Sequence, residues 1–130
     1  MLASASVTEN EIYSVIGEEG FQGLVAAFYR QVPQDEVLAP MYPAGDFAGA
    51  EQRLRDFLIF RFGGPQRYIE DRGHPRLRMR HAPFPVDQSA REHWLQMMNK
   101  ALAETEIPAE AKEILWAYFD STAAAMMNRG

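Results

Sequence analysis

Apolar residues recur at helical spacing along most of this chain. The clearest stripe joins Phe21 to Val32, where apolar positions follow an i, i+3, i+4, i+7 rhythm. Similar stripes follow Asp46, Asp87 and Pro108, each of which suits the start of a helix. The sequence has no strand-like alternation of any length. The pattern therefore predicts an all-α protein with four substantial helices and two or three short ones.

Prolines and glycines mark the expected helix boundaries. Proline breaks helix interiors, and the eight prolines leave four long proline-free stretches: 1–32, 44–64, 86–107 and 109–130. Thr8 and Glu11 have the spacing of a capping box. Gly17 and Gly20 are expected to interrupt the helix that begins after this capping box.

Two shorter regions lie between the long stripes. A helical turn is expected around residues 35–41, between Pro33 and Pro43, and Gly63-Gly64-Pro65 is expected to end the second long helix. Residues 66–85 show no long period, which is uncommon inside a compact domain and usually functional. This segment holds two histidines and five arginines: His74, His81, Arg67, Arg72, Arg76, Arg78 and Arg80. The arginines suit either a solvated face with weak ion pairs or an anion site. The absence of a glycine-rich phosphate loop from the sequence argues against a nucleotide.

Composition narrows the choice of function. With 130 residues, 47% of them hydrophobic, the chain is long enough for one domain, residues 1–130, and one core. The lack of cysteine excludes a disulfide scaffold, a thiolate metal site and a cysteine nucleophile. The net charge of −5 gives no support for nucleic-acid binding, and no apolar run reaches the length of a membrane span. Since the first residues also lack the features of a signal peptide, we expect a soluble, cytoplasmic protein.

A histidine and three polar aromatic residues are the candidates for a site. His81 follows a short helical run, residues 76–80, from whose end its side chain can face a cavity. A lone histidine is more often structural, but it can bind iron where a porphyrin supplies the other four ligands. Tyr29 and Trp94 lie on apolar stripes, and Tyr42 lies beside the start of a helix. The buried O–H and N–H groups need partners, which are either the protein's own polar groups and water or a ligand in an apolar cavity.

Short motifs along nearly the whole chain resemble the group II truncated haemoglobins, the two-over-two globins of bacteria and plants. The matching passages are Phe28-Tyr29-Arg30-Gln31-Val32, Asp35-Glu36-Val37-Leu38 with Met41-Tyr42-Pro43, Ala48-Gly49-Ala50-Glu51 with Arg53-Leu54, Gly63-Gly64-Pro65, and Gly73 to Phe84. The last passage is the most specific, and the placing of the tyrosines and of Trp94 points to group II. The chain departs from the family at Gly17-Glu18-Glu19-Gly20, where a Gly-Gly pair often ends the first helix, and at Phe62, where close relatives often have tryptophan.

The resemblance implies a two-over-two helical sandwich around a haem, with His81 as the proximal ligand of the iron. It implies three distal groups that stabilise a bound ligand: Tyr29, Tyr42 and Trp94. The implied distal pocket contains Ala50, Leu54 and Phe28, and the groups implied near the haem propionates are Arg53, Tyr68 and Arg80. Apolar haem contacts are expected from Phe57, Leu77, Phe84 and Met98. The cofactor is expected to be non-covalent haem b, because there is no cysteine for attachment.

The resemblance implies a protein of oxygen binding or transport that binds O2 tightly and reversibly. NO and CO are expected to bind at the same iron. We expect a redox role in the removal of NO or reactive oxygen species, with an unidentified reductase as partner. The sequence does not separate two haem enzymes, an NO dioxygenase and a peroxidase that acts on peroxide. Both chemistries need distal donors and an open coordination position on the iron. An alternative of a different class is a cofactor-free helical binding or sensor module, which predicts a colourless protein. A homo-oligomer is also left open.

Overall fold

The computed structural model describes residues 7–42 and 46–129, and within them every regular element is a helix. The six α-helices are α1 (Ile12–Tyr29), α2 (Phe47–Arg61), α3 (Arg67–Arg72), α4 (Leu77–His81), α5 (Gln88–Glu104) and α6 (Ala109–Met126). Three 3-10 turns add η1 (Glu9–Glu11), η2 (Val32–Gln34) and η3 (Ala39–Met41). The all-α prediction is confirmed. The boundary expected at Pro43 lies outside the described residues.

Side-chain caps begin the helices where the sequence places them. The Glu11 carboxylate accepts hydrogen bonds from the Thr8 backbone N–H at 2.9 Å and from the Thr8 hydroxyl at 3.0 Å. The Asp46 carboxylate accepts from the Gly49 N–H at 3.1 Å, and that of Asp87 accepts from the Ala90 N–H at 2.9 Å. These bonds satisfy N–H groups that have no partner within the helix, so each cap fixes where its helix begins.

The expected interruption of the first helix is only partly right. Gly17 adopts φ +67° and ψ −179° inside α1, which kinks the helix there, whereas Gly20 is helical. A left-handed φ costs glycine little because it has no Cβ. The departure from the family pattern at residues 17–20 therefore affects the first corner of the fold.

Segment 66–85 contains two short helices. The helical run expected at residues 76–80 is confirmed as α4, whereas α3 was not expected. Each is too short to show a period in the sequence, and α3 is held by contacts with other helices. The Arg67 guanidinium donates two hydrogen bonds to the Glu18 carboxylate, at 2.6 and 3.1 Å, and the Tyr68 ring packs edge-on against Phe57 with centroids 5.4 Å apart. Tertiary contacts hold α3, which the sequence pattern alone missed.

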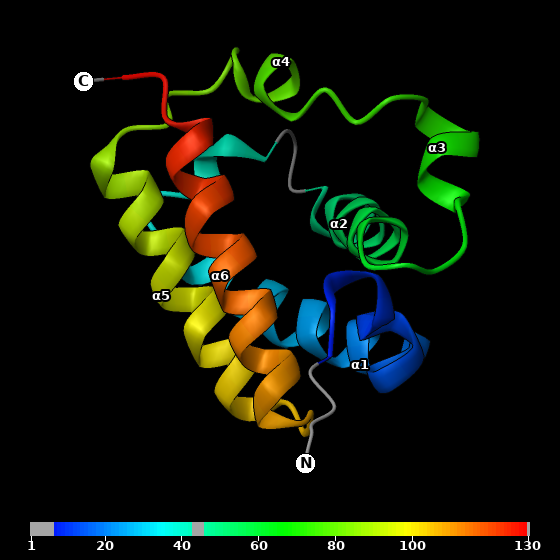
Figure 1. Ribbon diagram of the computed structural model, residues 1–130. Helices are drawn as coiled ribbons and strands as arrows, with labels where there is room; N and C mark the ends of the chain where they lie inside the picture. Colours follow the sequence, from blue (N-terminus) through cyan, green and yellow to red (C-terminus); the bar gives the residue numbers. More distant parts are fainter. Residues whose placement is uncertain (1–6, 43–45, 130) are drawn as a thin grey trace.

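Two pairs of long helices form the frame of the molecule. Figure 1 shows α5 and α6 side by side, with α2 seen nearly end-on. From α2 the chain continues through α3, at the right of the view, to α4 at the top. Backbone contacts join α1 to α2 and to α5, α5 to α6, and α4 to α6. None of the described helices is long and apolar enough to cross a membrane.

The core lies where α1 meets the other long helices. Phe21, Phe28 and Phe62 are fully buried, and Phe119 of α6 is nearly so. Phe62 packs edge-on against Tyr118 with ring centroids 5.2 Å apart.

The corner after α2 packs closely on the start of α1. The Tyr13 N–H donates to the Phe62 carbonyl at 3.0 Å, and Gly63 adopts φ +97°. A Cβ on Gly63 would overlap the Asn10 carbonyl oxygen. The Gly63-Gly64 pair therefore ends α2 and also allows this close approach.

Candidate functional site

A cavity of about 470 Å³ is lined by residues of all six α-helices and of the segment around η3. Its volume is in the range of small-molecule and cofactor sites. The structure brings most of the sequence-predicted site residues into its lining: Tyr29, Tyr42, Ala50, Arg53, Leu54, Phe57, Tyr68, Leu77, Arg80, His81, Phe84 and Trp94. These residues come from chain segments far apart in the sequence, so only the fold makes them neighbours.

Phe28 and Met98 are outside the lining of this cavity. Both are fully buried. Phe28 packs behind the cavity wall, with its ring centroid 5.3 Å from that of Trp94 and 5.1 Å from that of Tyr29. Phe28 therefore supports two of the cavity residues from behind, in place of the direct role that the resemblance implied.

His81 is the last residue of α4 and is half-buried. Its Nδ1 lies 2.8 Å from the Leu77 carbonyl oxygen. A carbonyl oxygen can only accept, so Nδ1 carries a proton, and in the neutral imidazole Nε2 is then the nitrogen with the lone pair. A histidine that donates one ring N–H to a carbonyl and presents the other nitrogen is prepared to bind a metal ion.

Asn128, just beyond α6, holds the turn that follows His81. Its Nδ2 donates to the carbonyls of His81 at 3.2 Å and Phe84 at 3.0 Å, and its Oδ1 accepts from the Val86 N–H at 2.9 Å. No sequence motif marks this role, because the partners are backbone groups, which every residue has. The end of the chain therefore helps to place the candidate metal-binding histidine.

Three polar aromatic side chains occupy the part of the cavity formed by α1, α5 and the segment before α2. The hydroxyls of Tyr29 and Tyr42 lie 3.3 Å apart. Burial, with a smaller effect of Tyr42, raises the pKa of the Tyr29 hydroxyl. Burial also raises the pKa of Tyr42, against the opposing effects of the Tyr29 hydrogen bond and Arg53. Both hydroxyls therefore stay protonated at neutral pH and can act as donors, as can the half-buried Trp94 indole.

The arginines around the cavity differ in how far they are already engaged. The Arg80 guanidinium donates to the carbonyls of Pro75 at 2.7 Å and Arg72 at 3.0 Å, so it holds the loop between α3 and α4. Arg53 lies 3.5 Å from Asp46 on a partly exposed surface, where such a pair is weak. Arg72 lines the cavity and is exposed. Arg53 and Arg72 are thus the cations most available to an anionic group at the cavity edge.

The sequence missed the contribution of α6. Its lining residues are Tyr118, Phe119, Thr122, Ala123 and Met126. Their helical spacing identified most of them as inward-facing, but periodicity does not distinguish a side chain in the core from one on a cavity wall.

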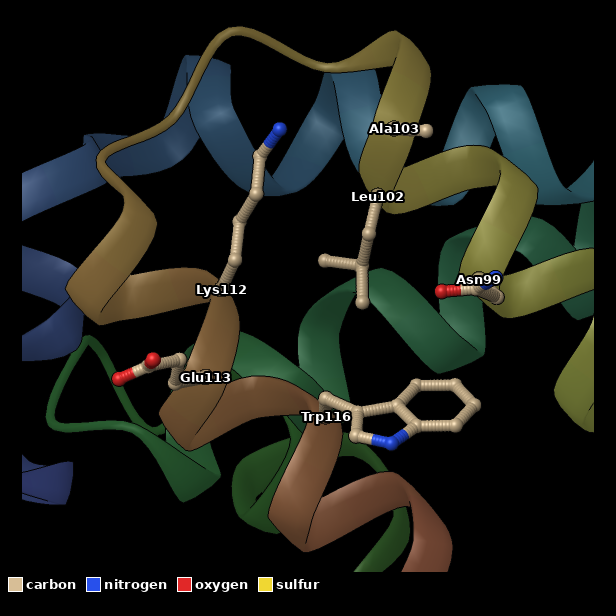
Figure 2. A pocket seen from close by; sticks show the side chains of 6 residues that line it. All are labelled: Asn99, Leu102, Ala103, Lys112, Glu113 and Trp116. Carbon is tan, nitrogen blue, oxygen red and sulfur yellow. The ribbon is translucent and has the colours of Figure 1, made fainter.

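A second hollow, of about 330 Å³ and more open, lies between the later part of α5 and the start of α6. Figure 2 shows its lining: Asn99, Leu102, Ala103, Lys112, Glu113 and Trp116. None of the sequence-predicted site residues is among them.

Comparison with known proteins assigns the chain to a family. The model of the bacterial-like globins matches residues 11–128. The chain belongs to this globin family, in its truncated, group II branch. It is 36% identical over 120 residues to the group 2 truncated hemoglobin YjbI of Bacillus subtilis. The matched region covers 92% of this chain and 90% of that protein.

Solved globin structures share the fold of this truncated globin. The hemoglobin of Chloroflexus aurantiacus superposes with a TM-score of 0.88 at 46% identity, covering 91% of this chain and 98% of that one. The truncated oxygen-avid haemoglobin of Bacillus subtilis gives 0.85 at 36% identity, covering 90% and 98%. The two-over-two globin fold expected from the sequence is confirmed.

Haem b with its iron is the cofactor of this family, and the residues of this chain fit it. The cavity walls are largely aliphatic and aromatic, as a porphyrin requires. His81 has a ring nitrogen free to bind iron, and Arg53 and Arg72 offer cations for carboxylates. Non-covalent binding agrees with the lack of cysteine in the sequence.

Proposed function

We propose that the protein binds O2 tightly and reversibly, and NO and CO at the same site, with His81 as the proximal ligand of the haem iron. One observation carries this proposal: a histidine with a free Nε2 and three polar aromatic donors line the same largely apolar cavity. When bound, the haem supplies an iron coordination position that accepts a diatomic gas.

The chain's own residues then decide how long the gas is retained. Tyr29, Tyr42 and Trp94 keep their protons at neutral pH and can donate to a ligand that carries partial negative charge. A hydrogen bond to a charged acceptor is worth about 1.5–3 kcal/mol, which corresponds to roughly ten- to a hundredfold in affinity. Since the two tyrosine hydroxyls are 3.3 Å apart, one can donate to the other while the second donates into the cavity.

Slow release suits redox chemistry better than the transport of O2. We therefore propose a role in the removal of NO or reactive oxygen species, supported by an external reductase that returns the iron to the ferrous state. The truncated haemoglobin of Bacillus subtilis is oxygen-avid, which supports tight binding here by similarity. A cytoplasmic location stays a prediction from the sequence.

Peroxidase chemistry is the second candidate, and the position of the histidines favours gas binding over it. A dedicated peroxidase is expected to use a distal histidine as acid and base. Among the described residues that line the cavity, His81 is the only histidine. His93 instead directs its Nδ1 to the Asp35 carboxylate at 2.7 Å.

The absorption spectrum of the purified protein tests the proposal. We expect a Soret band that shifts on addition of CO, and we expect His81→Ala to lose the iron–histidine signature. The matched control is His74→Ala, because His74 is exposed and outside the cavity lining. A colourless protein would support a cofactor-free module, and unchanged spectra in His81→Ala would exclude His81 as the ligand. Parallel assays of NO consumption and peroxide turnover separate the two haem functions.

A further inference from the structure

A hydrogen bond between α5 and the segment before α2 is not used by the proposed function. His93 Nδ1 lies 2.7 Å from Asp35 Oδ1, and the two side chains are 32% and 15% exposed. His93 directly precedes Trp94, one of the cavity donors. A short, largely shielded contact of this kind holds its two partners more firmly than an exposed ion pair does.

Asp35 also organises the backbone that follows it. Its Oδ2 accepts the N–H groups of Val37 at 3.2 Å and Leu38 at 2.8 Å. Burial raises the pKa of Asp35, but the hydrogen bonds from His93 and Leu38 outweigh it, and the net pKa is lowered. The carboxylate is therefore ionised at neutral pH, and one side chain fixes both the turn and its attachment to α5.

The segment fixed in this way carries part of the cavity wall. Leu38, Met41 and Tyr42 line the cavity. The Tyr42 hydroxyl lies 3.3 Å from that of Tyr29. Within the described part of the chain, the His93–Asp35 contact is the only side-chain hydrogen bond between residues 35–42 and α5. It therefore links the two elements that present Tyr42 and Trp94.

We infer that His93 and Asp35 are positioning residues that set the separation of Tyr42 and Trp94 across the cavity. Neither lines the cavity, so both would act through the elements to which they belong. This inference rests on the function proposed above. Without the contact, the 35–42 segment loses its anchor on α5, and the two donors no longer face one ligand in a single arrangement.

Three variants separate positioning from general stability. His93→Leu keeps much of the side-chain volume and removes the hydrogen bond, whereas His93→Asn keeps an N–H donor near the place of Nδ1. Asp35→Asn removes the charge from the other partner and remains informative if His93→Leu folds poorly. His74→Leu is the matched control, because His74 is an exposed loop histidine outside the cavity lining.

The first measurement needs no cofactor. Hydrogen exchange of the Val37 and Leu38 amides, followed in the haem-free protein, reports whether the turn is held. We expect faster exchange in His93→Leu and Asp35→Asn, and near-wild-type exchange in His93→Asn and His74→Leu. Unchanged exchange in both His93→Leu and Asp35→Asn would overturn the inference, because the contact would then not hold the segment.

The second measurement is made on the haem-loaded protein. We expect O2 release to be about tenfold faster in His93→Leu, the low end of the effect of losing one hydrogen bond to a charged ligand, with a broadened or split CO stretching band. His93→Asn should restore both. If His93→Leu loses stability but keeps the wild-type release rate and CO band, the contact is only structural and the inference is wrong. If wild-type protein binds no gas, the proposed function has failed, and the amide exchange still tells whether the contact holds the turn.

Discussion

Removal of the Tyr29 hydroxyl tests the chemistry of the cavity directly. Tyr29→Phe keeps the ring, which is 92% buried and packs edge-on against Phe28 with centroids 5.1 Å apart, so the cavity wall stays in place. What is lost is one hydroxyl, 3.3 Å from that of Tyr42. The variant therefore changes the hydrogen bonding of the cavity and very little of its shape.

Two magnitudes follow from this geometry. The separation of the two hydroxyls is long for an O–H···O bond. Its loss should therefore lower the free energy of unfolding by only about 0.5 kcal/mol, the low end for a neutral hydrogen bond. A donor lost from a ligand with negative charge costs about 1.5–3 kcal/mol, so O2 release should be roughly ten- to a hundredfold faster. The ligand effect should therefore exceed the stability effect several times over.

Stopped-flow displacement of O2 by CO measures release, and urea unfolding of the same sample measures stability. Tyr13→Phe is the control, because Tyr13 is half-buried and outside the cavity lining. Trp94→Phe is measured alongside, since it removes the donor of another helix. If neither Tyr29→Phe nor Trp94→Phe changes the release rate, donors in this cavity do not retain the ligand and the proposed mechanism is refuted.

Two further predictions concern stability. Gly63→Ala should cost well over 2 kcal/mol of unfolding free energy, about 1–2 kcal/mol from the left-handed backbone and the rest from overlap with the Asn10 carbonyl. Gly73→Ala should cost only the backbone part, because its φ is +75° with nothing within 4 Å of the added Cβ; equal losses in chemical denaturation of the two variants would contradict the steric argument. Because the pKa of Asp35 is lowered in the folded protein, its ionised carboxylate adds to the free energy of unfolding. This stabilisation is complete above the pKa of an unfolded aspartate, about 3.9, and is lost as the pH falls through the lower pKa of the folded state. Asp35→Asn should thus be less stable than wild type at pH 6, with the gap narrowing below about pH 4; a gap that stays constant from pH 6 to pH 3 would show that the charge of Asp35 plays no part.

Local sequence patterns determined the long helices and several of their ends. The apolar stripes depend only on residues three or four apart, and the caps at Thr8, Asp46 and Asp87 depend on side chains that reach the next turn. Such interactions are complete within one segment, so they can be inferred without knowing the fold. The candidate histidine and the three aromatic donors were singled out by residue type and position, the resemblance to a family gave them roles, and the cavity lining contains all four.

Only the tertiary structure decided which inward-facing side chains line the cavity and which fill the core. Phe28 and Met98 lie outside the cavity lining, whereas Tyr118 and Met126 belong to it. The sequence could not place the engaged guanidinium of Arg80 or the turn held by Asn128, because both bind backbone carbonyls. Periodicity records that a side chain faces inward, but whether it meets another side chain or open space depends on how helices distant in sequence cross. That is the physical reason why this sequence specifies its helices locally and its cavity only as a whole.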